Sequence, residues 1–334
     1  MIQASGSGLQ ASARYVGVFW AFILAVTVLG VPSRALAQDS HLIVIAGVGG
    51  SEEHTAKFNK WAGAVIDTAK KRGVADANII YLGERTELDP ARMKLRSTRE
   101  NVVKAISDTA ARAKANDEVF ILLIGHGSFD GRTAAFNLPG PDLTAEEYKP
   151  LLEKLRLQRV VFVNTASSSG AFLSVLAGPG RTIVTATKTG GERNETRFAE
   201  FFIEAMSGDG ADRDRNGRVS VQEAFDYAKN KVVAAYEQDG NLLSEHATLD
   251  DGAEGKLAST QFLAPQRSRT TEMANADPAL RALVEERDAL ERQIAELKLK
   301  KDSTDAARYD EQLEKLLTEL ALKTRAIRDL EAKK

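Results

Sequence analysis

Short apolar runs alternate with helical segments between residues 41 and 187. The apolar runs are "HLIVIAGV" (41–48), "NIIYLG" (78–83), "EVFILLIGHG" (118–127), "RVVFVNTAS" (159–167) and "RTIVTAT" (181–187). Continuous β-branched runs of this length are typical of parallel strands that helices cover on both faces. The pattern therefore predicts an α/β fold with an open, mainly parallel sheet flanked by helices.

Two of the helical segments carry a sequence signature of a helix start. Ser97 with Glu100, and Thr144 with Glu147, fit a capping box, in which a hydroxyl and a carboxylate each accept a hydrogen bond from an unpaired backbone N–H. Helices are therefore predicted to begin directly after residues 97 and 144.

The pattern changes at the C-terminal end of this region. Residues 41–262 form the predicted main domain, residues 263–277 a linker, and residues 278–334 a charged helical segment with leucine-type 3-4 spacing at Leu280, Leu283, Leu290, Ile294, Leu297, Leu313, Leu316, Leu320, Ile327 and Leu330. The two halves of this spacing do not join across "KKDSTDAARY". We expect a helical hairpin or a broken coiled coil that could form a homo-oligomer; a single exposed helix docked on the domain is the alternative.

The N-terminal segment predicts export from the cytoplasm. Arg14 precedes the apolar run "VGVFWAFILAVTVLGV", and "ALA" follows at residues 35–37. This order is typical of a secretory signal peptide, here residues 1–37 with cleavage after Ala37. The run is shorter than the roughly 20 residues of a membrane-spanning helix, so an uncleaved anchor is the lesser alternative. We expect a periplasmic or secreted protein without stable membrane insertion after cleavage.

Composition excludes several classes of function. The chain is 43% hydrophobic and 28% charged, which is ordinary for a globular protein. Lys and Arg (45) nearly balance Asp and Glu (47), so no net positive field favours nucleic acid as a partner. The absence of cysteine excludes disulfides, thiol catalysis and thiolate metal sites.

The segment "DRDRNGRVSVQE" (212–223) fits the twelve-residue EF-hand loop. Such a loop supplies the six to eight oxygen ligands that Ca²⁺ requires, and Gly217 stands at its sharp turn. With a single loop in the sequence, we expect a structural calcium site; an acidic surface turn is the alternative. The predicted ligands are Asp212, Asp214, Asn216, the carbonyl of Arg218, Ser220 and Glu223.

Polar and small residues collect where the predicted strands end. These segments read "GVGGSEE", "GHGSFDG", "NTASSSG" and "TATKTGGERNET", and ligands of open α/β sheets bind at the carboxyl ends of strands. His126 follows a buried strand and is a candidate general base or acid; a histidine hydrogen-bonded within its loop is the alternative. His54 and His246 lie in polar segments that we expect to be exposed.

"GHG" (125–127) and "ASSSG" (166–170), each after a sheet strand and in this order, resemble the caspase and legumain clan of cysteine peptidases, in its bacterial form. "LPGPDLTAEEY" and "TATKTGGERNET" look like the legumain-type connection and substrate-pocket loop. The resemblance spans about 41–262 and implies a caspase-like fold with His126 as the catalytic histidine and Ser167 at the position of the nucleophilic cysteine. It also implies that substrate lies near Gly127, Ser168, Ser169, Thr185 and Thr187.

Serine at the nucleophile position changes the function that the resemblance implies. A serine hydroxyl requires a positioned base, whereas a thiol ionises near neutral pH. We therefore expect a pseudopeptidase that binds a peptide or a protein partner. One alternative is a serine hydrolase that uses Ser168, in an A-x-S-x-G pattern, or Ser167, with a histidine base such as His246 and Asp226 as a possible acid partner. Another is a structural scaffold that oligomerises through its C-terminal helices.

Overall fold

The computed structural model describes residues 38–252, 255–264, 277–299 and 305–331. The predicted signal peptide, residues 1–37, lies outside these residues, and so does most of the predicted linker. Within these ranges, the helices are all too short or too polar to cross a membrane.

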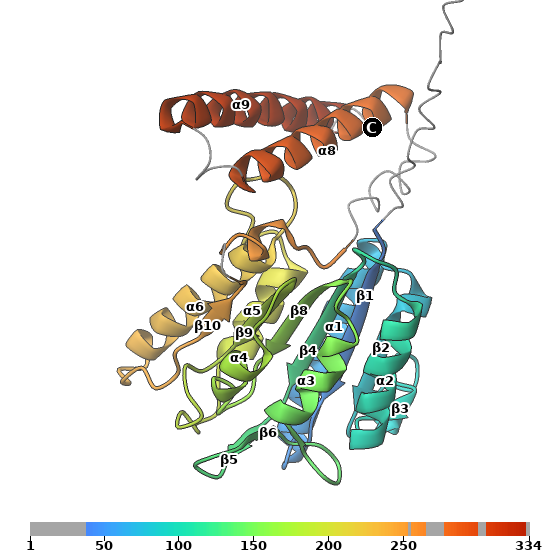
Figure 1. Ribbon diagram of the computed structural model, residues 1–334, viewed down its shortest axis with the longest axis vertical. Helices are drawn as coiled ribbons and strands as arrows, with labels where there is room; N and C mark the ends of the chain where they lie inside the picture. Colours follow the sequence, from blue (N-terminus) through green and yellow to red (C-terminus); the bar gives the residue numbers. More distant parts are fainter. Residues whose placement is uncertain (1–37, 253–254, 265–276, 300–304, 332–334) are drawn as a thin grey trace, which may run out of the picture. The chain divides into compact units, whose positions relative to one another are not determined.

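A seven-stranded sheet forms the centre of the main domain (Figure 1), with the strand order β10-β9-β8-β4-β1-β2-β3. All neighbouring strands are parallel except β10, which is antiparallel to β9. The five predicted apolar runs supply β1, β2, β4, β8 and β9, which confirms the predicted α/β fold. The strands are β1 Ser40–Ala46, β2 Ile79–Gly83, β3 Leu95–Arg96, β4 Glu118–Ile124, β8 Arg159–Asn164, β9 Arg181–Thr185 and β10 Thr248–Asp250.

Helices cover both faces of this sheet. Side chains alternate along each strand, so Leu42 and Val44 of β1 join one apolar core while Ile43 and Ile45 join the other. The first core contains residues of α1 (Glu52–Lys71), α5 (Phe198–Ser207) and α6 (Val221–Gln238), and the second contains residues of α2 (Arg99–Arg112), α3 (Ala145–Glu153) and α4 (Ala171–Leu176). Burial on both faces explains why the central positions of β1, β4 and β8 are continuously apolar.

One of the two predicted helix starts is confirmed and the other is wrong by one residue. Thr144 and Glu147 form the capping box of α3 as predicted. The N-cap of α2 is Thr98, whose hydroxyl accepts a hydrogen bond from the backbone N–H of Asn101. Ser97 instead donates its hydroxyl to the carbonyl of Ala46 at 2.6 Å, because it is fully buried at the end of the sheet.

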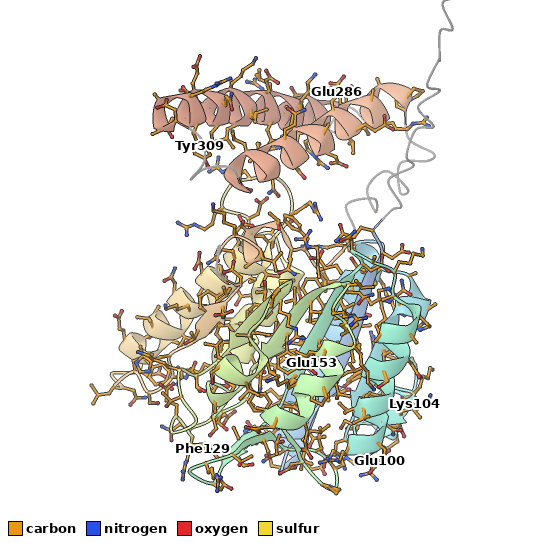
Figure 2. All side chains as sticks on the ribbon, in the orientation of Figure 1. Glu100, Lys104, Phe129, Glu153, Glu286 and Tyr309 are labelled. Carbon is orange, nitrogen blue, oxygen red and sulfur yellow. The ribbon has the colours of Figure 1, made fainter. Side chains whose placement is uncertain are left out.

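A small antiparallel sheet follows β4 directly. It consists of β5 (Gly127–Phe129), β6 (Ala134–Phe136) and β7 (Leu143–Thr144). The apolar run that begins at Glu118 ends as a strand at Ile124, so Gly125 and His126 occupy the turn between the two sheets. Phe129, labelled in Figure 2, lies in the hairpin that β5 and β6 form next to this turn.

The C-terminal segment forms two helices, α8 (Pro278–Leu299) and α9 (Ala306–Glu331), that pack against each other in antiparallel fashion. Leu280 of α8 clusters with Ile327 near one end of the pair, and Ile294 clusters with Leu320 further along it. The predicted hairpin is therefore confirmed, and the alternative of a single helix is wrong.

Candidate active site

Loops that carry the candidate chemical groups follow three adjacent strands. Because β8, β4 and β1 are neighbours and parallel, the segments after them meet at the same edge of the sheet. Gly49 follows β1, His126 follows β4 and Ser167 follows β8. The sheet topology thus brings the predicted histidine and the predicted nucleophile position to neighbouring strand ends.

The ring of His126 is held by one hydrogen bond and two aromatic contacts. Its Nε2 lies 3.2 Å from the carbonyl oxygen of Gly49, and its ring meets those of His54 and Phe58 edge-on at 5.1 and 5.2 Å between centroids. A carbonyl only accepts, so Nε2 carries the proton of the neutral ring. Nδ1 is then the basic nitrogen, and within the described part of the chain it has no hydrogen-bond partner.

The side chain of Ser167 is engaged with the backbone of Gly127. Its hydroxyl donates to the Gly127 carbonyl at 3.0 Å and accepts from the Gly127 N–H at 3.3 Å. A Cβ atom on residue 127 would lie 2.3 Å from the Ser167 carbonyl, so only glycine permits this approach. Ser167 is 6% exposed, and its hydroxyl proton points to a backbone oxygen instead of a base.

Ser168 adopts an unusual backbone conformation. Its φ of +57° is in the left-handed region, which non-glycine residues adopt at a cost of roughly 1–2 kcal/mol. The backbone N–H of Ser168 donates to the carbonyl of Glu192 at 2.8 Å, which holds the turn. Its hydroxyl is buried and has no hydrogen-bond partner within the residues that the structure describes.

Ser169, Thr185 and Thr187 form a buried network behind this turn. The hydroxyl of Thr187 lies 3.2 Å from that of Ser169 and accepts the N–H of Gly170 at 2.8 Å. Thr185 donates its hydroxyl to the carbonyl of Thr187 at 2.8 Å. Ser169, Thr185 and Thr187 are each 0% exposed. These hydroxyls therefore brace the loop after β9 against the loop after β8.

The loop after β9, residues 186–196, contacts both the β5–β6 hairpin and the segment after β8. Gly190 packs against the ring of Phe129, where a Cβ atom would approach to 2.8 Å. Thr196 donates its hydroxyl to the carbonyl of Thr165, two residues before Ser167. Glu192 lies 3.1 Å from Nδ1 of His246. His246 is thus paired with a carboxylate of the loop, and Asp226 accepts from Gln222 on its own helix.

The sequence of this region matches one peptidase family. Residues 53–249, from the first turn of α1 to β10, match the Peptidase C13 family. The chain belongs to the Peptidase C13 family. Similar solved structures include drICE, with 8% identity, a TM-score of 0.40 and coverage of 64% of this chain and 87% of that one. The Drosophila initiator caspase Dronc is similar at 9% identity and a TM-score of 0.39, with coverage of 64% and 79%. No curated protein matches the sequence.

The C13 domain also contains the predicted EF-hand-like loop, between α5 and α6. Carboxylate oxygens of Asp212, Asp214 and Glu223 lie within 4.8 Å of one another. Asp212 accepts the N–H groups of Asn216 and Gly217, and Gly217 has a φ of +81° at the sharp turn. The oxygens converge in the manner that a hard cation requires, so the donor set fits Ca²⁺.

The end of this loop is tied to helix α6 and to the segment after η3 (Ala258–Thr260). Ser220 is the N-cap of α6, with Glu223 as its capping-box partner. Ser220 also forms an isolated β-bridge with Phe262, and the guanidinium of Arg218 lies over the Phe262 ring at 3.7 Å. These contacts fix the Arg218 backbone, whose carbonyl is the predicted calcium ligand.

Sequence reasoning assigned no role to Ser51 and Glu195 and expected His54 to be exposed, whereas His54 is half-buried beside His126. Ser51, His54 and Glu195 are joined by hydrogen bonds, and the His54 ring contacts the His126 ring. The signal available in the sequence was a serine three residues before a histidine at a helix start. Glu195 had no such signal, because it arrives from a loop that only the tertiary fold brings to α1.

Proposed function

We propose that this C13 domain binds a peptide or a protein partner at the strand ends that carry His126 and Ser167, beside the 186–196 loop, without cleaving it. The observation that carries the proposal is the hydroxyl of Ser167, which is bonded to the backbone of Gly127 on both its donor and acceptor sides. A serine nucleophile must instead pass its proton to a base. In this proposal Ser167 stands at the family's nucleophile position but keeps its proton on the backbone carbonyl of Gly127.

The surroundings of His126 support the same proposal. In serine enzymes a carboxylate orients the catalytic histidine and stabilises the imidazolium that forms during attack. In this domain the hydrogen-bond partner of His126 is instead a neutral carbonyl, that of Gly49. A cysteine nucleophile functions with a histidine alone, because its thiol ionises readily. A serine at the same position also requires a carboxylate that orients the histidine.

Fluorescence-polarisation titration with a labelled peptide library, combined with mass spectrometry of the peptides afterwards, tests this function. Saturable binding with intact peptides supports it. Robust cleavage by the wild type that Ser168→Ala abolishes and Ser167→Ala leaves unchanged would favour the serine hydrolase instead. The hydroxyl of Ser168 is buried and has no hydrogen-bond partner among the described residues, so no base is positioned to take its proton. This observation argues against the serine hydrolase.

Two further assignments belong to this proposal. The signal-peptide pattern of residues 1–37 supports a periplasmic or secreted location. The convergence of Asp212, Asp214 and Glu223 supports a structural Ca²⁺ ion that braces α5 and α6, with Asn216, the Arg218 carbonyl and Ser220 completing its ligands. Extracellular calcium concentrations suffice for weak sites of this kind, with Kd values of roughly 10⁻⁴–10⁻³ M.

A further inference from the structure

A mostly apolar pocket of about 530 Å³ lies between helix α6 and the segment that leads into strand β10. Its volume is within the range of roughly 300–1,000 Å³ that is typical of small-molecule sites. The apolar side chains that line it are Phe225, Val232, Val233, Leu243, Ala247 and Leu249. Neither His126 nor Ser167 is among its described lining residues, so the pocket is separate from the candidate active site.

The apolar side chains of this pocket are only partly withdrawn from solvent. Val233, Leu243 and Leu249 are half-buried. Leu243 and Leu249 pack against the apolar core that contains Phe225 and Val232, so apolar atoms of both α6 and the 243–249 segment form the walls. An apolar group that displaces water from these walls gains hydrophobic free energy. The pocket therefore favours a ligand with an apolar part.

Two exposed lysines line the same pocket, and neither has an acidic partner within the described part of the chain. Lys188 follows β9, and Lys229 lies on α6, where its Nζ is 5.7 Å from the centroid of the Phe225 ring. The third basic group of the lining, His246, already has a carboxylate partner, because its Nδ1 lies 3.1 Å from Glu192. Two ammonium groups beside an apolar surface favour a ligand with an anionic end.

The acid among the described lining residues is Glu245, and its carboxylate is engaged with helix α5. Both of its oxygens accept the backbone N–H of Arg197, at 2.8 and 3.1 Å. Burial raises the pKa of Glu245 to about 7, so at neutral pH a part of the molecules carries this side chain uncharged. Glu245 therefore opposes an anionic ligand less than an exposed carboxylate would.

We propose that this pocket binds an amphipathic monocarboxylate, with its apolar tail among the side chains of α6 and residues 243–249 and its carboxylate paired with Lys188 and Lys229. A fatty carboxylate of medium chain length has this chemistry. A neutral ligand of the same shape makes the apolar contacts without the ion pairs, and a cationic ligand meets two like charges. This ligand is distinct from the peptide or protein partner proposed for the strand ends at His126 and Ser167.

The test titrates the full chain with octanoate, octan-1-ol and acetate, and measures binding by saturation-transfer NMR. Octanoate should bind saturably and more tightly than octan-1-ol, and acetate should not bind in the same concentration range. Exposed ion pairs contribute roughly threefold each, so Lys188→Ala/Lys229→Ala should weaken octanoate about tenfold and leave octan-1-ol unchanged. Lys231→Ala, at an exposed lysine of α6 outside the pocket lining, is the matched control and should change neither affinity.

Val233→Glu tests the apolar part of the pocket separately. A carboxylate among the apolar side chains should weaken both octanoate and octan-1-ol by more than about tenfold, because their tails would then bury a charge. Ala234→Glu, at the next and exposed residue of α6 outside the lining, is the matched control, and urea unfolding checks that both variants are folded. Octanoate binding that Val233→Glu leaves unchanged, or equal wild-type affinities for octanoate and octan-1-ol, would overturn the proposal. Neither result bears on peptide binding, which the polarisation assay measures by itself.

Discussion

Ser167 and Ser51 differ in the hydrogen-bond partners of their hydroxyl groups. Ser167 is buried and donates to a backbone carbonyl, while Ser51 is exposed and faces an imidazole that a carboxylate orients. The difference arises from the partner of each hydroxyl proton, because a carbonyl holds the proton and a basic nitrogen can remove it. At the scale of residues, the hydrogen-bond partner of each hydroxyl, and not the residue type, distinguishes these two serines.

Replacing Ser167 by cysteine should create peptide hydrolysis. Sulfur ionises more readily than oxygen, and Nδ1 of His126 is available to pair with the thiolate, so no third residue is required. We expect Ser167→Cys to turn over peptides that the wild type only binds, as measured by mass spectrometry. The gain should disappear in Ser167→Cys/His126→Ala. Ser168→Cys, whose side chain is buried in the adjacent turn, is the control and should do much less.

At the scale of elements, a glutamate from another segment accepts a hydrogen bond from the backbone at the start of helix α5. Both carboxylate oxygens of Glu245 accept the backbone N–H of Arg197, at 2.8 and 3.1 Å, whereas Arg197 itself offers no side-chain cap. Glu245 is 3% exposed, and this burial raises its pKa to about 7. The helix start therefore depends on a group that titrates near neutral pH.

The free energy of unfolding should fall as pH rises from about 4.5 to 7, because the folded protein then retains a proton on Glu245 that the unfolded chain has lost. At about 1.4 kcal/mol per pH unit the contribution of Glu245 is at most about 3.5 kcal/mol. Glu245→Gln should flatten this slope in urea unfolding at several pH values. Glu118, with its pKa also raised to about 7 by burial, acts in the same direction and should leave a residual slope. An unchanged slope in Glu245→Gln would contradict the assignment.

The elements also show which features the sequence could predict. The five buried strands and the C-terminal helices were predictable because their apolar periodicity reports burial directly. Thr98, and not Ser97, is the N-cap of α2, because the hydroxyl of Ser97 donates to a backbone carbonyl at the end of the sheet. β10 was missed because it is half-buried and only three residues long. Glu195 could not be assigned, because its role depends on a contact with α1 that no local pattern encodes.

Calcium should stabilise the helix–loop–helix unit formed by α5, the 212–223 loop and α6. Binding to the native state alone adds about 2.7 kcal/mol at a calcium concentration a hundredfold above Kd, so the thermal midpoint should rise. Glu223→Gln keeps the capping box of α6, which accepts either residue, but loses the carboxylate ligand. We expect the midpoint of this variant to be insensitive to millimolar calcium in differential scanning calorimetry. If calcium raised the thermal midpoints of the wild type and of Glu223→Gln equally, the predicted calcium site would be wrong.

At the scale of the whole molecule, the chain extends beyond its family match. The match ends at residue 249, while α8 and α9 begin at Pro278 and Ala306. Leu320 of α9 is buried against α8, but Leu317 and Leu322 are 40% and 62% exposed on the same helix. They line a groove of about 740 Å³ along α9. Exposed leucines on an otherwise charged helix are typical of a surface that packs against another helix.

We therefore predict that the full chain self-associates through α9. Burial of a leucine side chain on association contributes roughly 1.5–3 kcal/mol, so two substitutions with charged residues should remove most of the driving force. The double variant Leu317→Glu/Leu322→Glu should be monomeric in multi-angle light scattering at concentrations where the wild type is dimeric or larger, with an unchanged far-UV circular dichroism spectrum. Leu157→Glu, at a leucine that is 62% exposed in the main domain, is the matched control and should keep the wild-type mass. A monomeric wild type, or an oligomer that survives both α9 substitutions, would contradict association through α9, and the helical hairpin would then have to act through a different partner.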